Sequence, residues 1–271
     1  MLGRRSRIEI KTDEQLRHMR AAGLVVARAL AATADAVAPG VTTGQLDAVA
    51  AEVIVDAGAR SNFKVYHGFP GVICASVNDE VVHGIPGDRV LREGDLISID
   101  CGAIVEGWHG DAAITVAVGE VRPELLALSA ATEQALWAGI ARALVGGHLS
   151  DIGAGCESVI GTRYGIVRDY VGHGIGSAMH MEPSVAHVGP PGRGPLLKKG
   201  MALAIEPMVT LGSPEVTVLA DDWTVATIDG SVAAHWEHSV ALTESGPVVL
   251  TASDGGVTRL AALGITVGDV S

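Results

Sequence analysis

The chain has 271 residues, enough for one large domain or two fused smaller ones. Hydrophobic residues make up 48% of it and aromatic residues only 3%, which excludes a disordered or fibrous protein and favours an interior packed from small side chains. The net charge of −12 argues against nucleic acid as a specific partner, because phosphate binding relies on lysine and arginine.

The same features indicate a compartment. No uninterrupted apolar run reaches the roughly 18 residues that a transmembrane helix needs, so we expect no membrane contact. The basic segment at residues 4–7 is not followed by an apolar stretch, so it is not a secretory signal. Cys74, Cys101 and Cys156 are widely spaced and odd in number, which fits a reducing compartment. We therefore expect a cytoplasmic protein.

In chain order, the first half predicts two helices followed by strands. Thr12 and Gln15 form a capping-box signature before a helical apolar stripe, which ends at Pro39. Thr42 and Gln45 repeat the signature before a second helix. Runs bounded by glycine and proline then predict strands at residues 72–77, 95–105 and 112–118.

The second half predicts the same order of elements. Pro123 suits the first position of a third helix, and Ser150 to Tyr164 supplies a fourth. Apolar runs at residues 202–205 and 239–242 indicate further strands.

The two halves are related at a single offset of 106 residues, which carries position 90 onto position 196. Val90–Asp100 aligns without gaps on Leu196–Glu206, and Val65–Gly68 falls on Val171–Gly174. We therefore expect an α+β fold in which a pseudo-two-fold antiparallel sheet, shared by both halves and flanked by helix pairs, encloses a central cleft. The expected organisation is an N-terminal tail (1–11), one catalytic domain (12–251, with pseudo-repeats of about 12–118 and 120–251) and a C-terminal segment (252–271).

Two carboxylates flank a predicted turn in the first half. If the strands on either side of residues 105–109 pair as a hairpin, Asp100 and Asp111 can lie opposite each other, where they need a cation or a shared proton. For this pair alone, two exposed acids at strand ends remain the simpler interpretation.

The second half strengthens the metal hypothesis. Glu206 is the repeat equivalent of Asp100 and ends an apolar strand, where a lone buried carboxylate is costly. His173 lies in a glycine-flanked turn, and Glu237 precedes an apolar strand. Four carboxylates and one imidazole exceed what one ion needs and suit a pair of ions, with Mn(II), Fe(II) or Co(II) preferred and Zn(II) allowed.

The order of these five residues resembles the ligand set of the methionine aminopeptidases, which have the pita-bread fold. Three runs resemble signatures of the type I branch: Ser76–Pro86, Tyr170–Pro183 and Ile205–Met208. The resemblance extends from about Ile8 to Leu250, and the lack of a Cys/His-rich N-terminal extension fits the short bacterial form.

The resemblance implies a role for each ligand. Asp100 would chelate one divalent ion, His173 and Glu206 would hold the other, and Asp111 and Glu237 would bridge the two ions (Co, Mn, Fe or Zn).

Three of the implied roles concern catalysis. Glu206 would also accept the proton of the nucleophilic water. His180 would hydrogen-bond the carbonyl or oxyanion, and His83 would contact the substrate backbone or assist the leaving amine. His67 is the repeat counterpart of His173, and its role stays open between function and inherited framework.

A methionine side chain needs a blind apolar pocket with sulfur or aromatic contacts. By motif position the candidates are Tyr66, Phe69, Cys74, Met179 and Trp223, each of which is also compatible with an ordinary core position. Met179 stands where bacterial members of the family usually have an aromatic residue, and Met181 where an acid is common, so both are expected to alter the shape of the pocket.

The implied substrate is the initiator methionine of nascent polypeptides with a small second residue, cleaved by a monomeric enzyme that contacts the ribosome transiently. Two alternatives stay open. A proline-specific peptidase of the same fold uses similar ligands but usually carries an additional N-terminal domain. A non-catalytic binding module typically loses ligands, whereas all five are present here.

Overall fold

The computed structural model describes residues 8–270, and the first seven residues of the predicted tail lie outside them. The helices are α1 (Asp13–Ala36), α2 (Thr43–Asp56), α3 (Pro123–Ile140), α4 (Leu149–Ile160) and α5 (Val257–Ala262), with a short 3-10 turn η1 (Tyr66–Gly68). The strands are β1 (Arg60–Ser61), β2 (Ile73–Val77), β3 (Glu80–Val82), β4 (Leu96–Val105), β5 (Trp108–Ala117), β6 (Gly165–Ile166), β7 (Gly172–Gly174), β8 (Met181–Val185), β9 (Ala202–Ile205), β10 (Met208–Thr210), β11 (Val216–Val218), β12 (Val225–Thr227), β13 (Ala233–His235), β14 (His238–Thr243) and β15 (Gly246–Val249).

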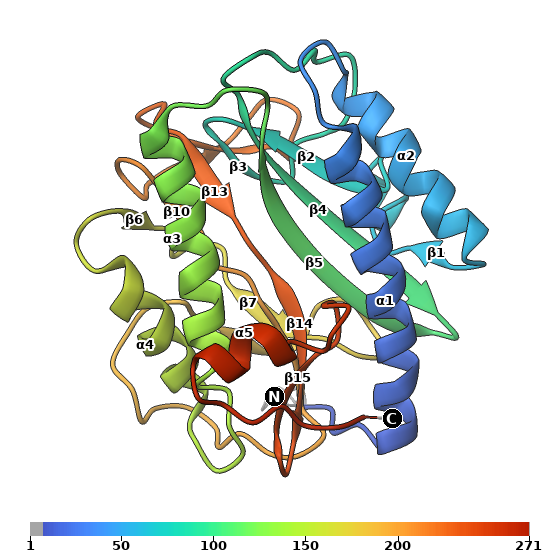
Figure 1. Ribbon diagram of the computed structural model, residues 1–271, viewed down its shortest axis with the longest axis vertical. Helices are drawn as coiled ribbons and strands as arrows, with labels where there is room; N and C mark the ends of the chain where they lie inside the picture. The colour runs from blue at the N-terminus through green and yellow to red at the C-terminus, as the bar shows by residue number, and fades with distance from the viewer. Residues whose placement is uncertain (1–7, 271) are drawn as a thin grey trace, which may run out of the picture.

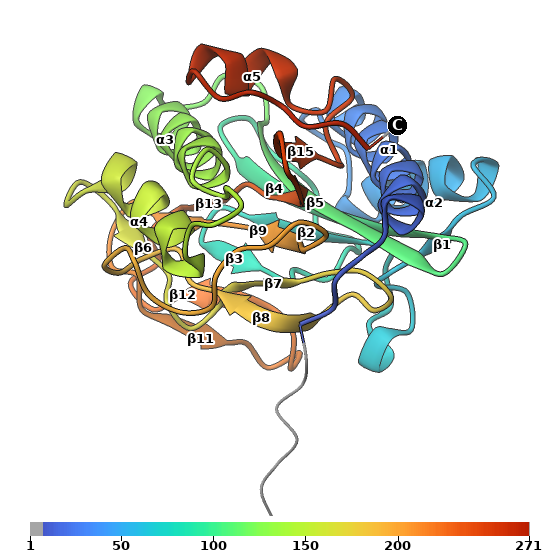
Figure 2. The same cartoon turned by 90° about the horizontal axis from the view of Figure 1, so that it is seen from below.

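The helices form pairs on one side of the strands. Helices α1 and α2 pack together, as do α3 and α4, and the strands run between and beneath the pairs (Figure 1). Viewed from below, α5 lies between α1 and α3, while β7, β8, β11 and β12 line the opposite side (Figure 2). This arrangement confirms the predicted α+β architecture with flanking helix pairs.

Both predicted capping boxes are present. The Gln15 amide N–H donates to Thr12 Oγ1 over 3.2 Å, and the Thr12 N–H donates to Gln15 Oε1 over 2.9 Å. Thr42 and Gln45 repeat the exchange at the start of α2. These bonds satisfy amide groups that a helix leaves free at its N-terminus, so local sequence fixes where each helix begins.

Two predicted boundaries are wrong by several residues. Helix α4 ends at Ile160 instead of Tyr164, because Gly161 takes a φ of 56° and leaves the helix. Strand β5 begins at Trp108 instead of Ala112, because the turn needs only two residues. Glu106 and Gly107 both have positive φ, the geometry of a tight hairpin.

The expected single sheet is also wrong in detail. Strand pairing divides the described strands into four antiparallel sheets, of which the largest are β15-β14-β9-β7-β8 and the β1-β4-β2 sheet that includes β5. The two halves are joined by the antiparallel pairing of β3 with β12 and by two backbone hydrogen bonds, of 3.3 and 2.9 Å, between Ala113 and Glu237. Short stretches of pairing therefore join the halves in place of one continuous sheet.

The internal repeat is visible in the contacts around the second helix of each half. Thr42 forms a bridge with Val90, and His148 forms one with Leu196, at the same offset of 106 residues as the sequence repeat. The loops around these bridges repeat as well. The Gly40 N–H donates to the Leu91 carbonyl, and the Gly146 N–H donates to that of Leu197.

Residues near both ends of the described chain pack against the body. The Lys11 N–H donates to the Gly200 carbonyl over 2.7 Å, and Leu260 of α5 is fully buried. The predicted domain limits at residues 12 and 251 stay a prediction. Within residues 8–270, no helix is both long and apolar enough to span a membrane.

Close packing of α1 generates a first prediction. A Cβ atom at Gly23 would lie 2.2 Å from the backbone oxygen of Leu250, which cannot move without shifting its strand connection. We expect Gly23→Ala to lower the free energy of unfolding by about 1–3 kcal/mol in urea titrations. Helix propensity alone predicts the opposite result, because replacing glycine with alanine inside a helix raises the free energy of unfolding by roughly 1 kcal/mol.

The matched control is Gly87→Ala, because a Cβ atom there meets no atom within 4 Å and the φ of Gly87 is not in the left-handed region. We expect this variant to stay within about 0.5 kcal/mol of the parent. A Gly23→Ala protein at least as stable as the parent would contradict the packing argument.

Candidate metal centre and its pocket

One cavity of about 280 Å³ gathers the side chains that the sequence predicted for the site. The five predicted ligands and the seven other predicted site residues all line it: Asp100, Asp111, His173, Glu206, Glu237, His83, His180, Tyr66, Phe69, Cys74, Met179 and Trp223. Phe63, His67 and Val82 complete the lining. The cavity places His67 at the site without deciding its role.

The β4–β5 hairpin supplies two carboxyl groups. The sequence suggested that the two acids can lie directly opposite each other. Asp111 instead pairs with Gly102, and Asp100 pairs with Ala113. The two acids are diagonal neighbours on the same face of the hairpin. Burial and the charges of Glu237 and Asp100 raise the pKa of the Asp111 carboxyl well above its usual range. Two carboxylates this close need a cation or a shared proton.

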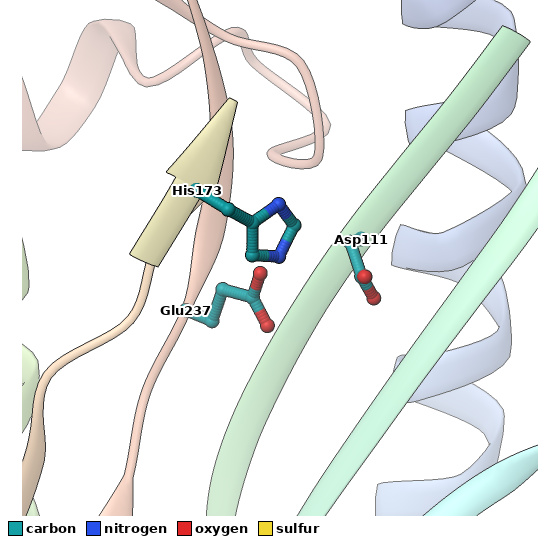
Figure 3. Close-up of side chains that lie close together, drawn as sticks. All are labelled: Asp111, His173 and Glu237. Atoms are coloured by element: carbon teal, nitrogen blue, oxygen red, sulfur yellow. The ribbon is translucent and has the colours of Figure 1, made fainter. Parts of the chain in front are cut away.

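The second half supplies the other three groups. His173 lies on β7 and pairs with Ala204, while Glu206 follows β9 directly. Glu237 lies between β13 and β14, where its backbone bonds to Ala113 of β5. His173, Glu237 and Asp111 therefore point toward one another from three separate segments (Figure 3). His173 Nε2 lies 3.5 Å from Glu206 Oε1.

Burial dominates the electrostatics of these groups. It raises the pKa of Asp100 to about 7 and raises the pKa of Asp111, Glu206 and Glu237 well above the usual range. Repulsion among the four carboxyls adds to the effect of burial on the last three. Burial lowers the pKa of His173 to about 4, so its imidazole is neutral and keeps a lone pair for a ligand.

The donor set fits divalent cations. Asp100 Oδ1, Asp111 Oδ1 and Glu237 Oε1 are buried acceptors that have no hydrogen-bond partner among the described residues. Two trios, Asp111–His173–Glu237 and Glu206–His235–Glu237, each bring their ligand atoms within 4.8 Å of one another. Unpartnered buried acceptors are costly, and a bound cation satisfies them while removing the repulsion.

Two further histidines border the ligands. The Nδ1 atom of His180 shares a hydrogen bond of 2.9 Å with the Tyr66 hydroxyl, and its ring lies 4.4 Å from that of His173. His83 has a positive φ of 62° and faces the rings of Trp223 and Tyr170. Burial and mutual repulsion with His180 lower the pKa of His83 to about 4. Both rings are therefore available as neutral donors or acceptors.

Part of the cavity wall is apolar. Phe69, Cys74 and Met179 are buried with Phe63 in one cluster, and the rings of Phe69 and Trp223 meet edge to face at 5.1 Å. Burial, together with the charges of Asp100 and Asp111, raises the pKa of the Cys74 thiol well above its usual range. Cys74 is therefore an uncharged wall residue rather than an activated nucleophile.

Sequence reasoning missed two buried histidines beside Glu206. His187 Nε2 accepts the Glu206 N–H over 3.0 Å, and His235 Nε2 lies 3.7 Å from Glu206 Oε2. One signal pointed to His235. It precedes Glu237 by two positions, and alternate residues of an extended segment face the same way. His187 has no comparable signal, because it lies 19 residues from Glu206 in the chain.

A wider cavity of about 610 Å³ adjoins the first. The two cavities share His83, His173, His180 and Glu206, so these residues stand at their junction. Glu182, Ser184 and Met208 help to line the wider cavity.

Removal of metal is predicted to make stability depend on pH in a definite direction. The pKa of Asp100 is about 7 in the folded protein against 3.8 as its ordinary value, so protonation stabilises the metal-free fold at low pH. That stabilisation is lost as pH rises through about 7. We therefore expect the thermal midpoint of chelator-treated protein to be lower at about pH 8 than at about pH 5.5.

Added Mn(II) is expected to reverse the loss at the higher pH, because it binds the ionised carboxylates of the folded state. Asp100→Asn is the control: we expect it to weaken the pH dependence of the metal-free protein without abolishing it, because the pKa values of Asp111, Glu206 and Glu237 are raised as well. A thermal midpoint that rises with pH in metal-free protein would contradict the prediction.

Comparison with known proteins agrees with this geometry. The profile of metallopeptidase family M24 matches residues 17–244. The chain is 54% identical over 247 residues to methionine aminopeptidase 1 of Mycobacterium tuberculosis, covering 88% of this chain and 92% of that one. It is 47% identical over 242 residues to methionine aminopeptidase 1 of Bacillus subtilis, covering 89% and 98%.

Solved structures extend the comparison. The crystal structure of methionine aminopeptidase from Thermotoga maritima superposes with a TM-score of 0.88 at 40% identity, over 90% of this chain and 99% of that one. Prolidase from Pyrococcus furiosus shares the fold alone, with a TM-score of 0.71 at 20% identity over 90% of this chain and 65% of that one. The chain belongs to metallopeptidase family M24 and, within it, to the methionine aminopeptidases with the pita-bread fold.

Proposed function

We propose that this metalloaminopeptidase removes the initiator methionine from newly made polypeptides whose second residue is small. One observation carries the proposal: four buried carboxyls and His173 line the same cavity as the apolar side chains of Phe69, Cys74 and Met179. A polar centre for hydrolysis thus lies within reach of an apolar pocket for a thioether side chain.

Two divalent ions are assigned to the centre. Asp100 would hold one ion, His173 and Glu206 would hold the other, and Asp111 and Glu237 would be shared between them. The two trios of converging ligand atoms both include Glu237, which supports a bridging position for that residue. Mostly oxygen ligands with one imidazole suit Mn(II), Fe(II), Co(II) or Zn(II).

When bound, the ions supply positive charge that acidifies a water molecule and polarises the scissile carbonyl. The remaining work falls to side chains. The Glu206 carboxylate accepts the proton of the attacking water and returns it to the leaving amine. With the Tyr66 hydroxyl donating to Nδ1, His180 carries its proton on Nε2 and donates it as a hydrogen bond to the developing oxyanion. His83, at the junction of the two cavities, binds the substrate backbone or assists the leaving amine.

The apolar part of the cavity wall selects a methionine side chain. Sulfur and aromatic groups from Tyr66, Phe69, Cys74, Met179 and Trp223 surround the space for the side chain. Thioether contacts with such groups are favourable, and the cavity wall limits the length of the substrate side chain that fits. The second residue of the substrate must pass the junction where His83, His173, His180 and Glu206 converge, which favours a small side chain there.

We infer a cytoplasmic, monomeric enzyme that meets its substrate as it emerges from the ribosome. The three cysteines are buried as free thiols, which supports a reducing compartment. A proline-specific activity is disfavoured, because the prolidases and Xaa-Pro peptidases of the same fold resemble the chain at 18–23% identity, against 54% for methionine aminopeptidase 1 of M. tuberculosis. A binding module without chemistry is disfavoured by the complete ligand set.

The direct test is release of methionine from Met-Ala-Ser by apoprotein given Mn(II), Fe(II), Co(II) or Zn(II) separately. We expect metal-dependent release that falls at least about 100-fold in Asp111→Asn, because a bridging oxygen is replaced by an amide. The matched control is Asp56→Asn, since Asp56 is an exposed carboxylate at the end of α2.

Peptide choice separates the alternatives. Faster cleavage of Xaa-Pro peptides than of Met-Ala-Ser would replace the methionine assignment with a proline-specific one. Equal rates on Met-Leu and Met-Ala peptides would contradict the restriction to small second residues. A folded protein that binds no metal on titration would favour a binding module.

Met179 provides a prediction for the pocket alone. Its side chain is buried beside Phe69 and Cys74 in the apolar part of the cavity wall. We expect Met179→Ala to raise KM for Met-Ala-Ser about 10-fold with a smaller change in kcat, because it removes apolar contacts to the methionine side chain. Leu126→Ala, a change to an exposed residue of α3 that lines neither cavity, serves as its control. An unchanged KM in Met179→Ala would remove Met179 from the pocket.

A further inference from the structure

His235 is a buried histidine beside the metal centre, for which the proposed mechanism has no use. Its side chain is 1% exposed, and its Nε2 atom has no hydrogen-bond partner within the described part of the chain. Glu206 Oε2 lies 3.7 Å from this atom. A polar ring atom buried without a partner is costly, so its placement beside a carboxylate calls for an explanation.

The backbone of His235 is firmly held. Its N–H donates to Ser98 Oγ over 3.2 Å and to Thr115 Oγ1 over 3.0 Å, and its carbonyl accepts from the Thr115 hydroxyl over 2.8 Å. On the other side, His235 pairs with Met208 of β10. Residues from both halves therefore fix the point from which the ring extends toward Glu206.

Glu206 is in turn surrounded by imidazoles. Its backbone N–H donates to His187, its Oε1 lies 3.5 Å from His173 Nε2, and its Oε2 lies 3.7 Å from His235 Nε2. His173 lines the 280 Å³ cavity, whereas His235 does not. The two rings thus approach the carboxylate from different directions, His173 from inside the cavity and His235 from behind Glu206.

We propose that His235 is a positioning residue for Glu206: its Nε2–H anchors Oε2 and so directs Oε1 into the cavity toward the metal and substrate. This inference rests on the proposed function of Glu206. A distance of 3.7 Å is longer than the roughly 3 Å of a hydrogen bond, and a small rotation of the Glu206 side chain closes the gap. An anchored second oxygen limits the orientations of the carboxylate, as outer contacts do for metal ligands in general.

A direct ligand role for His235 is the competing interpretation. One of its ring nitrogens lies within 4.8 Å of a carboxylate oxygen of Glu206 and of one of Glu237, as a third ligand would. The absence of His235 from the cavity lining favours the positioning role, because an ion must share open space with each of its ligands. The two interpretations predict different behaviour for a variant that keeps an N–H donor but lacks the ring.

The experiment compares His235→Gln with His235→Leu. A glutamine side-chain amide can place an N–H near the position of Nε2, whereas leucine fills the space without a donor. Apoprotein of each variant is titrated with Co(II), and the affinity is followed by calorimetry and the coordination by the visible absorption of the bound ion. Steady-state constants for Met-Ala-Ser are measured in parallel.

We expect His235→Leu to weaken Co(II) binding about 10–100-fold and to lower kcat with little change in KM. We expect His235→Gln to restore the affinity, the spectrum and kcat to within about 3-fold of the parent. His18→Gln, a change to a partly exposed histidine of α1, is the matched control. The thermal midpoint of each apoprotein shows whether the variant is folded.

Two outcomes would overturn the proposal. If both folded variants lose affinity and show a changed absorption spectrum, His235 is a ligand. If folded His235→Leu binds Co(II) with the parent's affinity and spectrum, His235 has no part in the centre. Failure of the proposed function is distinguishable, because the parent would then release no methionine while the Co(II) titrations would still report on His235.

Discussion

The mutual repulsion of four buried carboxyl groups is the constraint on which this structure depends. Burial alone raises the pKa of Asp100 to about 7, and the charges of its neighbours raise the pKa values of Asp111, Glu206 and Glu237 further. No chain gathers such groups through their own attraction, so their backbones must be held by other contacts. A hairpin, a strand end and a bridge between the halves do this. Cation binding offsets the cost of holding the carboxyls together, so the free energy of metal binding contributes to the stability of the fold.

Backbone contacts between the two halves hold ligand segments of both halves together. Ala113 and Glu237 exchange two backbone hydrogen bonds, and Ala113 pairs with Asp100 across the hairpin. One residue of β5 therefore connects a ligand of the first half to a ligand of the second. The Ser239 hydroxyl adds a second link, accepting from the Asp111 N–H and donating to the Asp111 carbonyl. The geometry of the site is thus set by backbone pairing, which side-chain repulsion cannot easily distort.

Much of this was predictable from sequence, and the failures have physical causes. The capping boxes at Thr12 and Thr42 and the repeat were readable because they depend on neighbouring residues or on self-similarity. The register of the hairpin was not, because it depends on a two-residue turn at Glu106 and Gly107, and moving the turn shifts every pair. The division into four sheets and the contact of His187 with Glu206 depend on long-range packing that no local pattern encodes. His235 was predictable only in part, because its spacing from Glu237 was visible in the sequence but its proximity to Glu206 was not.

The surroundings of Glu206 separate it from the other carboxyls. Asp100, Asp111 and Glu237 each keep one buried oxygen for which the described residues supply no donor, which suits a group that binds only a cation. Glu206 instead has an imidazole beside each of its oxygens and a third at its backbone. A group that accepts and returns a proton must keep its orientation in both charge states, and neutral imidazoles on either side can meet either state. The three histidines therefore favour Glu206, rather than the bridging acids, as the residue that handles protons during hydrolysis.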